Sequence, residues 1–78
     1  MAGAFLLINV GLSSEDQVVD ALRGIANVKE AYATYGVYDV VARVEAESLE
    51  KLKEIVTTRI RRVPNVRATL TTVIADEL

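Results

Sequence analysis

The chain has 78 residues, of which 51% are hydrophobic, a formal net charge of −2, and neither cysteine nor histidine. This length allows one domain, and the missing residue types exclude disulfides, thiolate metal sites and the commonest general base. The charge provides no basic field for nucleic acid, and no apolar run approaches the roughly 18 residues that cross a membrane. We therefore expect a cytoplasmic protein without a targeting segment.

The first part of the chain predicts a strand, a helix and a second strand. Residues 4–10 form a short apolar run, which is typical of a buried strand. Ser14 and Gln17 form a capping-box pattern, and Gly24 marks the expected end of the helix that follows. Residues 28–34 then alternate in polarity as a second strand.

The second part predicts a strand, a helix and a final strand. Residues 38–45 alternate again, and Ser48 is a candidate N-cap for a helix with one apolar stripe. Pro64 prevents that helix from continuing, and residues 66–75 are rich in β-branched side chains.

The two helix-to-strand turns repeat one another. Residues 23–29 resemble residues 61–67, and each segment ends a helix and begins a strand. Two βαβ halves with matching turns form a split βαβ arrangement. We therefore expect an α+β, ferredoxin-like βαββαβ fold, in which two helices cover one face of a four-stranded antiparallel sheet.

The other face of this sheet is expected to be apolar. Alternation assigns to it Phe5, Leu7, Tyr32, Val41 and Val73, with Asn9, Glu30, Thr34, Arg43, Arg67, Thr69 and Thr71 among them. Toward the helices it assigns Leu6, Ile8, Val10, Ala31, Ala33, Val40, Ala42, Val44, Ala68, Leu70, Thr72 and Ile74. Burying several hundred Å² of apolar surface contributes roughly ten kcal/mol before association costs, which predicts a homodimer through the sheet face.

The turn between the middle strands carries an unusual pair, Gly36 and Asp39. Glycine accepts positive φ, whereas aspartate is a poor strand residue and here begins a strand. Asp39 would hold the ammonium group of a ligand, accept backbone N–H bonds from a neighbouring subunit, or accept local backbone N–H bonds in the turn. The last of these roles is the commonest.

Hydroxyl and phenol groups offer weaker candidates. Thr69 and Thr71 would either bind polar ligand groups or simply reflect the strand preference of threonine. The tyrosines near the turn, Tyr32, Tyr35 and Tyr38, would form a pocket wall or anchor an interface. The sequence contains no nucleophile–base pair, metal cluster or cofactor motif, so we expect neither an enzyme nor a cofactor. It also lacks a recognition helix, so we expect no direct DNA binding.

Two stretches together resemble a known family. They read Gly36-x-Tyr38-Asp39 and Arg61-x-Val63-Pro64-x-Val66-x-x-Thr69-x-Thr71. This combination is similar to the RAM domain, the effector-binding domain of the Lrp/AsnC (leucine-responsive, feast/famine) transcription regulators. The family's usual glycine after the proline is Asn65 here, and asparagine also tolerates a left-handed backbone. The resemblance identifies residues 1–78 as a single RAM domain without the family's helix-turn-helix.

The resemblance implies a regulatory module that binds an amino acid and assembles. Dimers would form through the sheets and join into octameric or decameric rings, with the ligand in clefts between dimers. Full-length regulators of the family would be further partners. The implied ligand residues are Gly36, Asp39, Thr69 and Thr71, with weaker candidates Tyr32, Val37 and Tyr38. The alternatives are an oligomerisation adaptor without a ligand, or an ACT-type regulatory domain of an enzyme.

Overall fold

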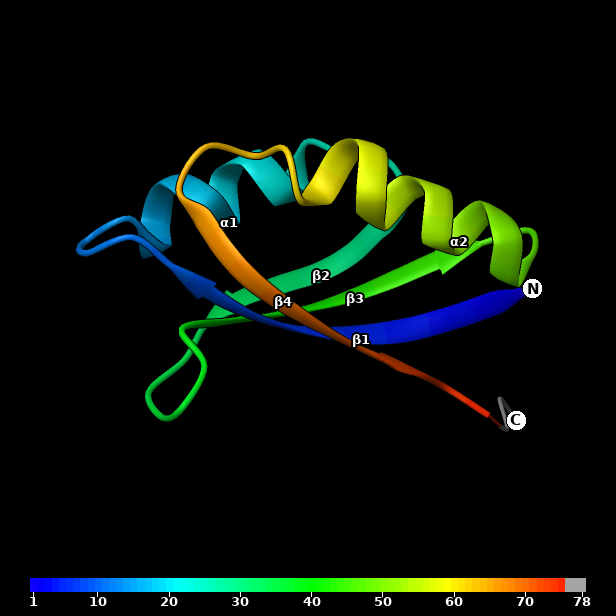
Figure 1. Cartoon of the computed structure of the whole chain (residues 1–78), viewed down its shortest axis with the longest axis horizontal. Helices are drawn as coiled ribbons and strands as arrows, with labels where there is room; N and C mark the ends of the chain where they lie inside the picture. The colour runs from blue at the N-terminus through cyan, green and yellow to red at the C-terminus, as the bar shows by residue number, and fades with distance from the viewer. Residues whose placement is uncertain (76–78) are drawn as a thin grey trace.

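The computed structural model describes residues 1–75 as a sheet with two helices on one side (Figure 1). The elements are β1 (Ala2–Val10), α1 (Glu15–Arg23), β2 (Val28–Ala33), β3 (Val40–Ala46), α2 (Leu49–Ile55), the π-helical segment η1 (Val56–Ile60) and β4 (Val66–Val73). The strands pair antiparallel in the order β2-β3-β1-β4. The predicted ferredoxin-like fold is confirmed. No helix of residues 1–75 is long and apolar enough to cross a membrane.

The core lies between the helices and the covered sheet face. Alternate residues of β1 and β3 point into it, and Leu6, Ile8 and Val40 are fully buried there. Leu22 of α1 and Leu52 of α2 pack against the same cluster. The predicted alternation of these two central strands is therefore confirmed.

The two helices begin differently. The Ser48 hydroxyl accepts a hydrogen bond from the Lys51 backbone N–H at 3.1 Å, as an N-cap does. The predicted capping box at Ser14 is wrong, because no side-chain cap bond forms there. Gln17 instead accepts a hydrogen bond from the Asn65 side chain at 3.3 Å. Asn65 has φ 73°, in agreement with the expected left-handed turn.

The second helix widens after Ile55 into the π-helical segment η1. The Arg61 backbone N–H donates to the Val56 carbonyl at 2.9 Å, five residues back. The Thr58 hydroxyl donates to the Glu54 carbonyl at 2.7 Å, a bond that competes with regular helix geometry. The wider turn still buries Val56 and Ile60.

The predicted orientation of β4 is wrong, and a β-bulge is the reason. Val10 pairs with Val66 and Asn9 with Ala68, so Arg67 is the extra residue and reverses the alternation that follows. Beyond the bulge, the buried residues Ala4, Leu6 and Ile8 pair with Val73, Thr71 and Thr69 respectively. Thr69, Thr71 and Val73 therefore lie on the helix-covered side, whereas Ala68, Leu70 and Thr72 lie on the opposite face.

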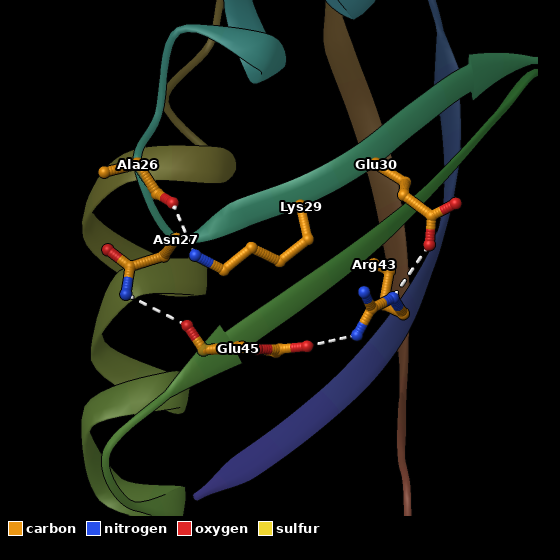
Figure 2. Close-up of polar contacts among 6 residues, drawn as sticks. All are labelled: Ala26, Asn27, Lys29, Glu30, Arg43 and Glu45. Atoms are coloured by element: carbon orange, nitrogen blue, oxygen red, sulfur yellow. Dashed lines mark hydrogen bonds and ion pairs between the residues drawn. The ribbon is translucent and has the colours of Figure 1, made fainter.

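We call that opposite face the open sheet face. Its large apolar members are Phe5, Leu7, Tyr32, Val41 and Leu70. The apolar character predicted for it is confirmed, with Leu70 in place of Val73. Phe5, Leu70 and Tyr32 remain 43%, 48% and 51% exposed. Figure 2 shows Arg43 of β3 between Glu30 and Glu45, with which it forms ion pairs.

This charged group also sets the ionisation of its members. The hydrogen bond from Arg43 lowers the pKa of Glu30 below its ordinary value of 4.5, and a bond from Tyr32 acts in the same direction. The same contact with Glu30 raises the pKa of the Tyr32 phenol. The positive charge of Arg43 is paired with the carboxylates of Glu30 and Glu45. The three residues therefore interrupt the apolar surface without leaving Arg43 unpaired.

Candidate ligand-binding site

Asp39 joins the loop between β2 and β3 to the end of β1. Its Oδ2 atom accepts a hydrogen bond from the Val10 backbone N–H at 2.9 Å, and its own N–H donates to the Ile8 carbonyl at 2.9 Å. The Asn9 amide lies 3.5 Å from the same Oδ2 atom. The acceptor role expected for Asp39 is therefore present, but its donor comes from β1 and not from the local turn.

The hairpin loop, residues 34–39, is held at its base by Thr34. The Thr34 N–H donates to the Asp39 carbonyl at 2.9 Å, and its hydroxyl donates to the Tyr38 carbonyl at 2.8 Å. The Asn9 side chain donates to the Val37 carbonyl at 3.0 Å. These bonds fix both sides of a loop that projects beyond the sheet, as Figure 1 shows.

Gly36 determines the backbone conformation at the tip of the loop. Its φ of +149° is a value that residues with side chains rarely adopt, although a Cβ atom at this position would meet no neighbouring atom within 4 Å. The constraint is therefore on the backbone and not on packing. The absence of neighbouring atoms within 4 Å leaves the backbone at Gly36 itself open to a ligand.

Two surface hollows meet at Asp39. The hairpin hollow, of about 370 Å³, is lined by Glu15, Asp16, Ala33, Thr34, Tyr35, Gly36 and Asp39. The loop hollow, of about 420 Å³, is lined by Val10, Gly11, Leu12, Ser13, Glu15, Asp39 and Arg67. Asp39 and Glu15 line both hollows, and we call the two neighbouring hollows together the Asp39 depression.

The depression combines charges of both signs. Both side-chain hydrogen bonds of Asp39 use Oδ2, and Oδ1 receives none from residues 1–75. Glu15 and Asp16 supply two further carboxylates, and Arg67 supplies a guanidinium in the loop hollow. A carboxylate accepts from an ammonium group, and a guanidinium binds a carboxylate through paired N–H donors. The arrangement suits a small zwitterion.

The structure brings together only part of the predicted ligand set. Gly36 and Asp39 share the hairpin hollow, and Val37 and Tyr38 belong to the same loop. Thr69 and Thr71 instead line a separate groove between α2, η1 and β4. The buried Ile8 pairs with Thr69 on one side and with Val40, the residue after Asp39, on the other. Ile8 therefore separates Thr69 from the strand that begins after Asp39.

Tyr32 also lies away from Asp39. Its ring belongs to the open sheet face, where its hydroxyl donates to Glu30 at 3.1 Å. The Arg23 guanidinium lies 5.8 Å from the ring centre. Sequence reasoning did not assign Glu15 and Arg67 to the site, because only the fold places a helix start and a strand bulge beside the hairpin. One residue in the sequence could have indicated the site: Asn9 is polar within an apolar strand, and its side chain contacts Val37 and Asp39.

Comparison with known proteins gives one consistent family. The family model described as the Lrp/AsnC ligand binding domain matches residues 3–78. The hypothetical protein PHS023 from Pyrococcus horikoshii is 35% identical, with a TM-score of 0.92 over 99% of this chain and 93% of that one. TTHA0845 from Thermus thermophilus is 29% identical, with a TM-score of 0.92 over 100% and 98% of the two chains. A search of curated proteins gave no match.

A more distant likeness concerns a longer protein. The transcriptional regulator NMB0573 of Neisseria meningitidis, solved as an L-Met complex, is 13% identical, with a TM-score of 0.85. The match covers 99% of this chain and 51% of that one, and at this identity it shows the fold alone. The family matched over nearly the whole sequence is a regulatory ligand-binding domain and not an enzyme family. This chain belongs to the Lrp/AsnC family, through its ligand-binding domain.

Proposed function

We propose that this chain is a self-assembling regulatory domain that binds an amino acid in the depression beside Asp39. The observation that carries the proposal is that Asp39, Glu15 and Arg67 together line the loop hollow. The ligand's ammonium would bind Asp39 Oδ1 and Glu15, and its carboxylate would bind Arg67 in the loop hollow. The L-Met complex of the Neisseria regulator supports an amino acid as the ligand class.

The ligand's side chain would contact the hairpin loop. Val37 is 85% exposed and Tyr38 is half-buried, so both are available to shape the pocket. Within one chain, the proposal assigns no ligand contact to Tyr32, Thr69 or Thr71, because they lie on other surfaces. The exposed hairpin tip would complete its pocket against a neighbouring dimer.

The chain would also dimerise through the open sheet face. Phe5, Leu7, Tyr32, Val41 and Leu70 present an apolar surface that antiparallel sheets facing water normally lack. Dimers would then join into octameric or decameric rings, or combine with full-length Lrp/AsnC regulators, in the cytoplasm. The RAM domain would act there without contacting DNA directly.

Calorimetry against the twenty amino acids tests the ligand role. Asp39→Asn keeps an acceptor for the Val10 N–H but removes the charge that attracts ammonium, so we expect binding to weaken about tenfold or more while the assembly persists. Asp20→Asn, on the exposed side of α1, has the same charge change and should bind as the parent protein does. Equal affinity of the two variants would remove Asp39 from the ligand site.

A second candidate is an oligomerisation adaptor without a ligand. The bond from Val10 N–H to Asp39 favours it, because that bond gives the aspartate a structural task. Under this alternative, no amino acid gives heat on an assembled sample, and Asp39→Ala disturbs assembly. Heat from an amino acid together with a preserved mass for Asp39→Asn would instead support the ligand role.

Sedimentation tests the dimer independently. Leu70→Asp places a charge in the open sheet face and should weaken association about a hundredfold. Leu49→Asp is the matched control, because Leu49 is 42% exposed and begins α2, away from that face. A dimer that survives Leu70→Asp but not Leu49→Asp would place the interface elsewhere.

A further inference from the structure

The groove between α2, η1 and β4, here called the β4 groove, is a second candidate site that the amino-acid proposal does not use. It has a volume of about 450 Å³, within the usual range for small-molecule sites. Leu52, Val56 and Val73 give it an apolar floor, and its polar groups come from both walls. It opens because α2 packs on β1 and β3 and leaves β4 largely uncovered.

The charge in the β4 groove has one sign. Its charged lining residues are Lys53 and Arg61, and no acidic residue lines it among residues 1–75. The ion pairs of that part of the chain involve Arg43 and Lys51, so Lys53 and Arg61 are unpaired within it. A protein with a net charge of −2 thus concentrates two cations over an apolar floor.

Hydroxyl groups add directional donors. Thr57, Thr69 and Thr71 line the groove, and the threonine hydroxyl bonds formed within residues 1–75 belong to Thr34 and Thr58. The three groove hydroxyls are therefore free to donate to a bound acceptor. Two cations and three donors around an apolar floor favour an anion with an apolar body.

The internal repeat shows that this opening is particular to the second half of the chain. The repeat that aligns residues 23–29 with residues 61–67 makes Arg61 the counterpart of Arg23 and Thr69 the counterpart of Ala31. Arg23 folds over β2 and donates two hydrogen bonds to the Ala31 carbonyl, at 2.7 and 3.1 Å. Arg61 makes no such closure within the described residues and lines the groove instead.

The helix is also irregular at the groove. Val56 and Thr57 belong to η1, and Arg61 closes its π-type hydrogen bond. Such wide turns are rare and occur frequently at functional sites, because they redirect side chains that a regular helix would place elsewhere. The wide turn, the uncommitted arginine and the uncovered strand coincide at one place.

We propose that the β4 groove binds a small organic carboxylate with a short apolar chain. The carboxylate lies between Lys53 and Arg61 and accepts from the threonine hydroxyls, while the apolar chain covers Leu52, Val56 and Val73. A free amino acid is disfavoured in the groove, because its ammonium group would meet two cations and no carboxylate. The groove should therefore reject the ammonium group that the Asp39 depression is proposed to bind.

The probe is 4-methylpentanoate, with leucine and 4-methylpentan-1-ol as matched ligands. Leucine has the same skeleton with an added ammonium group, and the alcohol lacks the charge. Calorimetry at low salt should show saturable binding of 4-methylpentanoate, and amide shifts in a TROSY titration should cluster at residues 52–61 and 69–73. The alcohol should not bind, and leucine should leave these amides unshifted.

Two arginine variants test which positive charge binds the carboxylate. Arg61→Gln should weaken 4-methylpentanoate about tenfold, whereas Arg62→Gln, an equal charge change on the next and exposed residue, should change it less than about twofold. Equal effects of the two variants, or shifts spread over all basic residues, would show a diffuse anion effect and overturn the proposal. A change of oligomeric mass in Arg61→Gln would overturn it in favour of a contact with a second copy.

Discussion

The two βαβ halves of this domain share a frame but close differently over their outer strands. In both, a helix ends, a turn follows, and the new strand begins with a bulge, at Lys29 in β2 and at Arg67 in β4. In the first half, α1 packs on β2 and Arg23 bonds the end of the helix to Ala31. In the second half, α2 packs on β1 and β3, and the Arg61 side chain makes no hydrogen bond to β4 within the described residues.

One supersecondary unit can therefore supply both stability and a surface for binding. The repeated turns and bulges place the outer strand of each half, β2 and β4, at the two edges of the sheet. The closed half buries Ala31, whereas the open half keeps Thr69 partly exposed at the corresponding position. A core residue and a groove residue therefore occupy equivalent places, and the covering helix decides which role each has.

The largest expected effect is a difference in stability loss between two paired residues, one covered by the helices and one uncovered. Leu6 and Thr71 are paired across β1 and β4 and point to the same side of the sheet. Leu6→Ala leaves a cavity in the core and should cost about 3 kcal/mol of unfolding free energy, whereas Thr71→Ala should cost less than about 0.5 kcal/mol. Urea denaturation at fixed protein concentration measures both. Comparable losses would mean that β4 is covered as fully as β1.

Periodicity predicted the fold because the central strands are regular where they meet the helices. The same reasoning failed at β4, since one extra residue at Arg67 turned Thr69 and Thr71 to the other side. The internal repeat contained the correction, because Ala31 was placed under the helices and Thr69 is its counterpart. The bond from Val10 to Asp39 could not be predicted, because no local pattern joins residues this far apart in the chain.

The next effect concerns the two equivalent arginines. Arg23→Met keeps the aliphatic stem but removes the donors to the Ala31 carbonyl, so it should cost about 1.5 kcal/mol. Arg61→Met removes no intrachain side-chain bond from the described residues and should change stability by less than about 0.5 kcal/mol. Chemical denaturation compares them directly. A loss for Arg61→Met as large as that for Arg23→Met would show that an arginine closes the second half as well.

The two helix starts provide a smaller contrast. Ser48→Ala removes the acceptor for the Lys51 N–H and should lower the unfolding free energy by about 1 kcal/mol. Ser14→Ala removes no cap bond, because the Ser14 hydroxyl lies toward the Leu12 carbonyl at 3.4 Å, so its cost should be a few tenths of a kcal/mol. Thermal unfolding of the two variants under one buffer resolves the order. The reverse order would show that α1 depends on its first turn more than α2 does.

The smallest effect lies on the open sheet face, where β2 has a charged contact and β4 has none of this kind among its outward residues. Because Arg43 lowers the pKa of Glu30, the folded protein binds that proton less tightly than the unfolded chain does. The resulting stabilisation is complete above the ordinary pKa of 4.5 and is lost as the pH falls through the lowered value. Glu30→Gln should therefore flatten the loss of stability between about pH 5 and pH 3 relative to the parent protein.

A matched variant separates this contact from the general removal of acidic charge. Glu47→Gln, which breaks no ion pair within residues 1–75, should keep the parent's pH dependence in urea titrations at each pH. If Glu30→Gln and Glu47→Gln have the same pH dependence, the contact with Arg43 does not contribute to stability. If only Glu30→Gln flattens the profile, the charged contact on β2 stabilises an edge whose counterpart, β4, depends on backbone pairing with β1.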